Sequence, residues 1–131
     1  GDSIMCVFGA PVHYEDHAMR AVKASLAIQR EIHRLNEKTD TRLRYHVHIG
    51  VNTGDVDAGN IRSQKRIEYT VLGDAVNVAA RLEKRAGAGQ IVIGDRTHNL
   101  VRERINCRPL GAERLKGKQN EIHLFEGTGE K

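Results

Sequence analysis

The fold of this chain is indicated first by one stretch, Glu68-Tyr69-Thr70-Val71-Leu72-Gly73-Asp74-Ala75-Val76-Asn77-Val78-Ala79-Ala80-Arg81-Leu82-Glu83. Residues 67–72 are rich in β-branched and aromatic side chains and predict a strand that stops at Gly73. A glycine at that point leaves room for a ligand to approach the backbone. A helix is predicted from residue 73 to about residue 85, closed by a glycine-rich turn at 87–89.

Two polar side chains of this helix, Asn77 and Arg81, are spaced i and i+4 and are predicted to share one face, one turn apart. Val76, Ala79 and Ala80 are expected to cover the other side. An amide beside a guanidinium can hold a sugar and a phosphate, because the planar fork of arginine donors matches phosphate oxygens. Asn and Arg on a helix are also common as solvated surface side chains, so the spacing alone leaves both interpretations open.

Working outward, a long helix is predicted over 16–37, because apolar and small residues recur there at helical spacing. They are Ala18, Ala21, Val22, Ser25, Ile28, Ile32 and Leu35. A strand is predicted over 43–51, where apolar side chains alternate with polar ones and place His46 and His48 on one face. Two histidines alone indicate a packed or solvated pair rather than a metal site.

The remaining predicted elements are strands at 3–8, 90–93, 105–110 and 121–125, a helix at 95–104, and a short continuation of the central strand at 56–61. Strands and helices mixed in this order predict an α+β fold. The expected architecture is a ferredoxin-like, palm-like α/β sandwich: a mostly antiparallel sheet with helices on one face.

The length and composition of the chain limit the number of domains, the class of partner and the cellular setting. The chain has 131 residues, which is the size of one domain, and a formal net charge of +4, which mildly favours an anionic partner. No apolar run is long enough to span a membrane, and the basic residues lack the aromatic interleaving of a nucleic-acid platform. The two cysteines, Cys6 and Cys107, form no C-x-x-C pair, so a reducing cytoplasmic setting is expected.

Several segments, in the correct order, resemble the catalytic domain of class III nucleotidyl cyclases. The helix stretch fills the fixed positions of that family's pattern Y-[T/D]-x-x-G-[D/N]-x-V-N-x-A-[A/S]-R. Residues 1–11 resemble the family's metal-binding hairpin, 46–54 its central strand, and 115–118 its late phosphate-binding lysine segment. The resemblance covers nearly the whole chain and implies the palm-like fold of the family.

The resemblance also implies site residues. Asp2 matches the second of two metal-binding aspartates, which coordinate two divalent cations, Mg²⁺ or Mn²⁺; carboxylate oxygen is a suitable ligand for such ions. Asn77 matches the asparagine that orients the ribose, and Arg81 the arginine that stabilises charge on the α-phosphate. Lys116 matches the lysine that holds the terminal phosphates.

The purine contacts are implied to come from Thr70 and the backbone of Val71. Family members that use ATP carry Asp or Thr at the first of these positions, whereas guanylyl cyclases more often carry Cys. A threonine hydroxyl can accept a hydrogen bond from the adenine amino group. The implied substrate is therefore ATP, which the family converts to 3′,5′-cyclic AMP and pyrophosphate. The implied assembly is a homodimer in which Asp2 of one protomer and Asn77 with Arg81 of the other share a site.

The sequence departs from the family pattern in one respect: no F-x-D-[I/L] segment, which carries the first metal aspartate, occurs in it. Residues 1–131 are therefore expected to be one cyclase catalytic domain that lacks its N-terminal part, including the first strand and helix. Because a second carboxylate is needed to hold two cations beside a triphosphate, this chain by itself is expected to have little activity.

Two other functions stay open: a guanylate cyclase, and a cyclase-like domain that binds nucleotide without turning it over. The retained Asp2, Asn77, Arg81 and Lys116 argue against the second. A diguanylate cyclase would need a G-G-[D/E]-E-F segment, and a P-loop enzyme G-x-x-x-x-G-K-[S/T]; neither segment occurs. The domain is expected to be cytoplasmic, with the protein that contains it either free or tethered to a membrane.

Overall fold

The computed structural model describes residues 3–10, 12–54, 73–114 and 121–131. In chain order the elements are α1 (His17–Glu37), η1 (Thr41–Leu43), β1 (Ile49–Val51), α3 (Gly73–Arg85), β2 (Ile91–Gly94), α4 (Asp95–Val101), β3 (Ile105–Arg114) and β4 (Glu121–Glu130). The predicted strands at 56–61 and 67–72 lie outside the described residues. Of the helices in the described ranges, none combines the length and the hydropathy that a membrane span requires.

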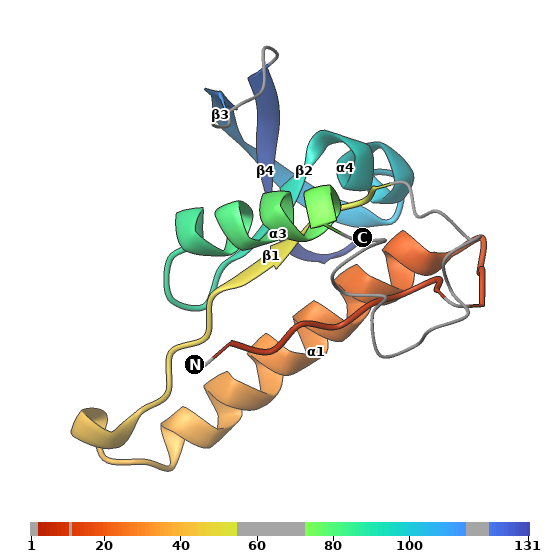
Figure 1. Ribbon diagram of the computed structural model, residues 1–131. Helices are drawn as coiled ribbons and strands as arrows, with labels where there is room; N and C mark the ends of the chain where they lie inside the picture. Colours follow the sequence, from red (N-terminus) through yellow and green to blue (C-terminus); the bar gives the residue numbers. More distant parts are fainter. Residues whose placement is uncertain (1–2, 11, 55–72, 115–120) are drawn as a thin grey trace.

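The described strands form a four-stranded mixed sheet in the order β1-β2-β4-β3 (Figure 1). Strand β1 runs parallel to β2, while β2 with β4 and β3 with β4 pair antiparallel. Two of the three pairings are thus antiparallel, as expected. Together with the helices, this sheet confirms the α+β prediction.

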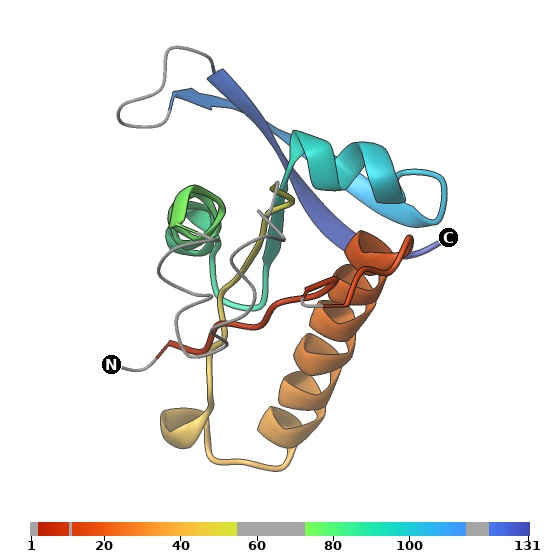
Figure 2. The ribbon, with the colours of Figure 1, turned by 45° about the vertical axis from the view of Figure 1, so that its right-hand side comes forward.

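Helices cover both faces of the sheet, which corrects the expectation that they lie on one face (Figure 2). Successive side chains of a strand point to opposite faces. In β2, Ile91 and Ile93 pack into a core cluster with residues of α1 and α4, whereas Val92 packs with residues of α3. The uninterrupted apolar run of β2 is explained by this burial on both sides.

The bounds of α1 agree closely with the predicted range 16–37, but its apolar face is buried only in its first half. Ala18, Val22 and Ser25 are buried against the sheet. Ile28 and Leu35, predicted on the same face, are 48% and 47% exposed. Figures 1 and 2 give the reason, since the C-terminal part of α1 extends past the edge of the sheet.

The central strand is shorter than the predicted range 43–51, because only its last three residues pair with β2. Upstream, α1 side chains replace a neighbouring strand. Asn36 donates to the carbonyl of Tyr45 at 2.7 Å and accepts from its N–H at 2.9 Å. Gln29 donates to the carbonyl of Val47 at 2.9 Å. His46 and His48 therefore lie on an extended segment without strand pairing.

Residues 3–8 form no strand, contrary to the prediction, and their apolar side chains are exposed, with Ile4 at 91%. The alternation that predicted a strand has no pairing partner among the described residues. A strand needs such a partner because its hydrogen bonds are made between segments rather than within one.

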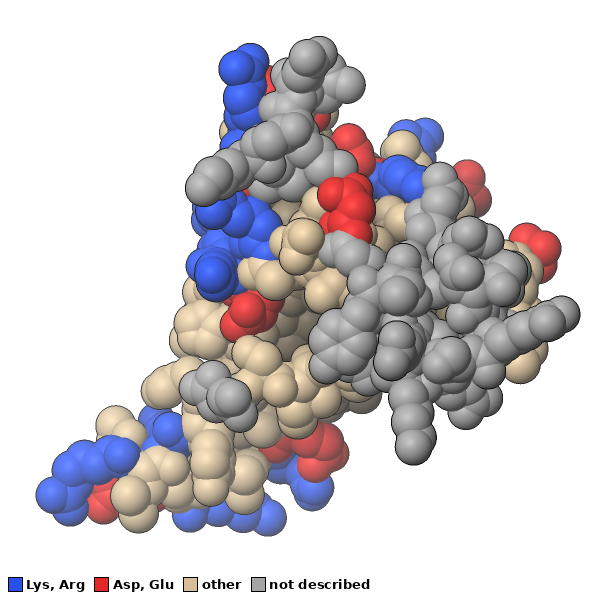
Figure 3. Space-filling model, in the orientation of Figure 1, with Lys and Arg blue, Asp and Glu red and all other residues tan. Residues whose placement is uncertain are grey.

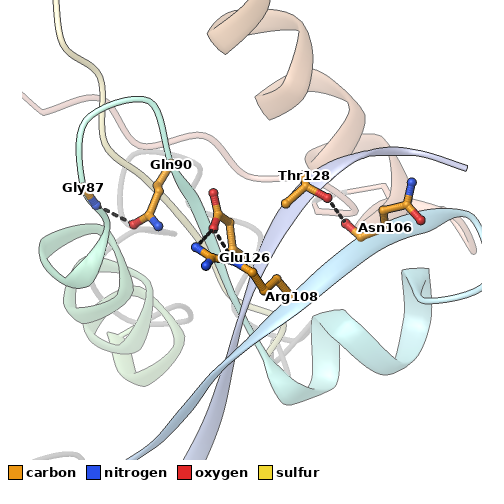
Figure 4. Close-up of polar contacts among 6 residues, drawn as sticks. All are labelled: Gly87, Gln90, Asn106, Arg108, Glu126 and Thr128. Atoms are coloured by element: carbon orange, nitrogen blue, oxygen red, sulfur yellow. Dashed lines mark hydrogen bonds and ion pairs between the residues drawn. The ribbon is translucent and has the colours of Figure 1, made fainter.

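The last two strands are longer than predicted. Thr128 donates its hydroxyl hydrogen to the carbonyl of Asn106 at 3.0 Å, and Arg108 pairs across the strands with Glu126 (Figure 4). The register shifts near Pro109, which cannot donate to the ladder, and Gly111 there has a φ of 103°.

Candidate nucleotide site

Helix α3 carries the two predicted site residues that the structure describes. Its inward side carries Val78 and Leu82, which are buried together with Ala86 just after the helix and with Val92 and Leu124. Asn77 and Arg81 are both exposed, which confirms that they lie on the face turned away from this core. Ala80 is exposed as well, so the expectation that it helps cover the inner side is wrong. The α3 residues in the buried core are Val78 and Leu82, one turn apart, rather than the predicted Val76, Ala79 and Ala80.

Helix α3 also packs closely against β1 at Gly50. A Cβ atom at Gly50 would lie 2.3 Å from the backbone nitrogen of Glu83 and 2.6 Å from the carbonyl oxygen of Ala79. No larger residue fits without moving the helix backbone. Glycine at this position therefore fixes how near α3 lies to the sheet.

The end of β1 is joined to both neighbouring helices by side-chain hydrogen bonds. Asn52 donates from Nδ2 to the carbonyl oxygen of Ala75 in the first turn of α3, at 3.1 Å. Thr53 shares a hydrogen bond of 2.8 Å with Thr97 of α4, which is fully buried. These contacts could not be found from local pattern, because their partners are distant in the chain.

Basic side chains lie at the C-terminal end of α3 and along β3. Lys84 and Arg85 occupy the last turn of the helix, and β3 contributes Arg114 and Arg108, of which Arg108 is paired with Glu126. Figure 3 shows Lys and Arg side chains gathered along the edge where the C-terminal end of α3 and strand β3 lie. Within the described ranges, no hydrogen bond or ion pair holds the side chain of Asn77 or Arg81. Such a surface suits an anionic ligand.

The other predicted site residues are Asp2, Thr70, Val71 and Lys116, and they lie outside the described residues. No group of three or more His, Cys, Asp or Glu side chains is placed to hold a metal ion in the part of the chain that the structure describes. The chemistry of Asp2 fits a divalent cation, but one carboxylate is an incomplete ligand set. Of the predicted site residues, the structure thus describes only Asn77 and Arg81, both exposed on α3.

The family model described as the adenylate and guanylate cyclase catalytic domain matches residues 1–127. The chain belongs to this cyclase family. Adenylate cyclase 1 of Rhizobium meliloti is 29% identical over 134 residues, which covers 98% of this chain and 20% of that protein. An adenylate cyclase of Mycobacterium bovis is 33% identical over 118 residues, covering 90% of this chain and 26% of that protein.

Solved cyclases have the same fold as this cyclase domain. The crystal structure of the guanylyl cyclase Cya2 matches with a TM-score of 0.75 at 31% identity, over 95% of this chain and 64% of that chain. The palm-like fold class is thereby confirmed. The cyclase chain spans about a fifth to a quarter of the length of the two curated relatives.

Proposed function

We propose that the protein containing this domain is an adenylate cyclase, which converts ATP to 3′,5′-cyclic AMP and pyrophosphate. The observation that carries the proposal is the exposed pair Asn77 and Arg81, which α3 presents one turn apart on the face away from the core. These residues occupy the fixed Asn and Arg positions of the cyclase signature. Two relatives that match nearly all of the chain are named adenylate cyclase.

In this reaction the 3′-hydroxyl oxygen of ATP bonds to its own α-phosphorus, and the bond from that phosphorus to the bridging oxygen of pyrophosphate breaks. The proton of the hydroxyl leaves to a base or to solvent. The protein has to position the reacting atoms and neutralise charge. Arg81 is suited to the α-phosphate, where negative charge grows, because its guanidinium offers several fixed donors. Asn77 is suited to the ribose through its amide, and Lys116 to the departing pyrophosphate.

Divalent cations, Mg²⁺ or Mn²⁺, are proposed to bind in part through Asp2 and to supply charge neutralisation at the phosphates. The site is proposed to form between two copies of the chain, with Asp2 from one protomer and Asn77 with Arg81 from its partner. The net charge of +4 supports binding of a triphosphate.

Adenine is favoured over guanine on the basis of Thr70, whose hydroxyl can accept from the adenine amino group. Guanylate cyclase is the alternative function. It is supported by the similarity in fold to a guanylyl cyclase at 31% identity. Because the sequence lacks an F-x-D-[I/L] segment, little activity is expected from the 131-residue chain alone.

The experiment measures cyclic AMP and cyclic GMP formed from ATP and from GTP, with Mg²⁺ and with Mn²⁺, by the whole protein in which the chain occurs. The 131-residue chain is assayed beside it. Cyclic AMP from the whole protein in excess of cyclic GMP is the expected result. An excess of cyclic GMP would establish the guanylate alternative. ATP binding without either product would favour a regulatory cyclase-like domain and overturn the proposal.

A further inference from the structure

We propose that Asn52 is a positioning residue for the cyclase reaction: its side chain holds the first turn of α3 and thereby sets where Asn77 and Arg81 meet the nucleotide. This inference rests on the proposed function. Asn52 does not itself need to touch the substrate. Its Nδ2 donates a hydrogen bond of 3.1 Å to the carbonyl oxygen of Ala75.

Because this bond holds the first turn of α3, it affects the positions of the site residues further along the helix. Ala75 precedes Asn77 by two residues and Arg81 by six. At a rise of about 1.5 Å per residue, the Arg81 backbone is roughly 9 Å further along the same rigid helix. A small tilt or shift of the first turn is therefore carried directly to both side chains. The helix carbonyl can accept this second hydrogen bond because it has two lone pairs.

Asn52 is itself fixed in place. It directly follows the last residue of β1, Val51, which pairs in register with Ile93 of β2. The next residue, Thr53, is bonded to the fully buried Thr97 at 2.8 Å. The following residue is a glycine, Gly54, where a Cβ atom would lie 2.6 Å from the Cβ of Ala75. The turn after β1 therefore sits directly against the start of α3.

Further along, the same side of the helix rests on β1 at Gly50, beside Ala79 and Glu83. Ala75, Ala79 and Glu83 are spaced i, i+4 and i+8, so they form one stripe along α3. Close backbone packing holds the middle of this stripe. The Asn52 amide holds its N-terminal end, which is the end nearest to Asn77.

The alternative is that Asn52 only stabilises the fold. The chain offers a matched control in Asn36, whose amide also donates to a backbone carbonyl, that of Tyr45, at 2.7 Å. Asn36 lies near the C-terminal end of α1, and its side-chain hydrogen bonds go to Tyr45 rather than to α3. Replacing Asn52 removes one side-chain bond to the backbone of α3, whereas replacing Asn36 removes two bonds to Tyr45 and leaves α3 untouched.

The test compares Asn52→Ala, the shape-conserving Asn52→Asp and the control Asn36→Ala in the whole protein. Turnover of ATP and the midpoint of urea unfolding are measured for each. We expect both Asn52 variants to lower kcat by about 10- to 100-fold, since misplacement of a catalytic group by about 1 Å has effects of that order. KM for ATP should change by less than about threefold, because most ground-state binding contacts remain. Asn36→Ala should retain kcat within about twofold while losing at least as much stability as Asn52→Ala, since it removes two hydrogen bonds.

Equal kcat in the Asn52 and Asn36 variants would overturn the inference. If the wild-type protein shows no turnover, the proposed function fails, and hydrogen exchange then decides the inference separately. Asn52→Ala should raise amide exchange in the first two turns of α3, whereas Asn36→Ala should not. Unchanged exchange in α3 of the Asn52 variant would overturn the positioning role regardless of activity.

Discussion

Gly50 is the residue that decides how closely α3 approaches the sheet. The side chains at Ile49 and Val51 point to the α1 and α4 face, and Gly50 points to α3, in agreement with its register opposite Val92. The atoms that a Cβ at Gly50 would strike belong to the α3 backbone, so no change of rotamer can relieve the clash. The helix would have to move away from β1.

We predict that Gly50→Ala destabilises the fold by about 2 kcal/mol or more, in the upper range of the cost of overpacking a core. Gly129→Ala is the control, because a Cβ there meets nothing within 4 Å and its backbone is not in the left-handed region. That variant should change stability by less than about 1 kcal/mol. Urea unfolding of both variants gives the two free energies. Equal stability of the two would show that α3 does not pack as closely as described.

The two residues of the candidate site that the structure places were predictable from sequence, and Asn52 was not. Asn77 and Arg81 share a face because of helix geometry, which depends only on their spacing. The partner of Asn52 is 23 residues away in the chain, so the bond exists only once the turn after β1 and the start of α3 have packed together. Local pattern carries no information on such a contact.

Among the elements, the helices followed the sequence more closely than the strands. The predicted helix at 73–85 and the observed α3 have the same bounds, α1 differs by one residue from its prediction, and α4 begins as predicted but ends three residues early, at Val101. Helix hydrogen bonds are made within one segment, so periodicity and end signals suffice to locate it. The strand predicted at 43–51 is only partly formed because α1 side chains, not a strand, bond its upstream backbone.

Helix α4 is attached to the sheet by a ring stack. The imidazole of His98 lies on the ring of Phe125 in β4, with ring centroids 3.7 Å apart and an angle of 9° between the planes. Burial, with a smaller contribution from the charge of Arg102, lowers the pKa of His98 below its usual value of 6.5. The folded state therefore favours the neutral ring.

We predict that protonation of His98 weakens the fold on mild acidification. Because its folded pKa lies below the unfolded value, the unfolded chain takes up the proton first. The stability contribution of the neutral ring is complete above pH about 6.5 and is lost as pH falls below it toward the folded pKa. Thermal unfolding between pH 7.5 and 5 measures this loss. His98→Phe keeps an aromatic stack and should reduce the slope; an unchanged slope would show that His98 does not contribute to it.

At the scale of the whole molecule, the proposed shared site makes a prediction about mixed dimers. Asp2→Ala and Arg81→Ala proteins should each be inactive alone, because each damages both sites of its own homodimer. In an equal mixture, half of the dimers are mixed and each has one intact site. About a quarter of the wild-type activity should therefore return if subunits exchange freely in a two-fold dimer. Cyclic AMP formation after co-refolding measures this recovery, and its absence would contradict a shared site.

The central claim is that Arg81 on the exposed face of α3 acts on the phosphates of ATP, and turnover by three matched proteins tests it most directly. The whole protein is compared as wild type, as Arg81→Ala and as Arg30→Ala, which removes an exposed arginine of α1. We predict that Arg30→Ala keeps kcat within about twofold, while Arg81→Ala lowers it by about 100-fold or more, the usual effect of removing a donor to developing charge. Loss of activity to the same extent in both variants, or undiminished activity in Arg81→Ala, would contradict it.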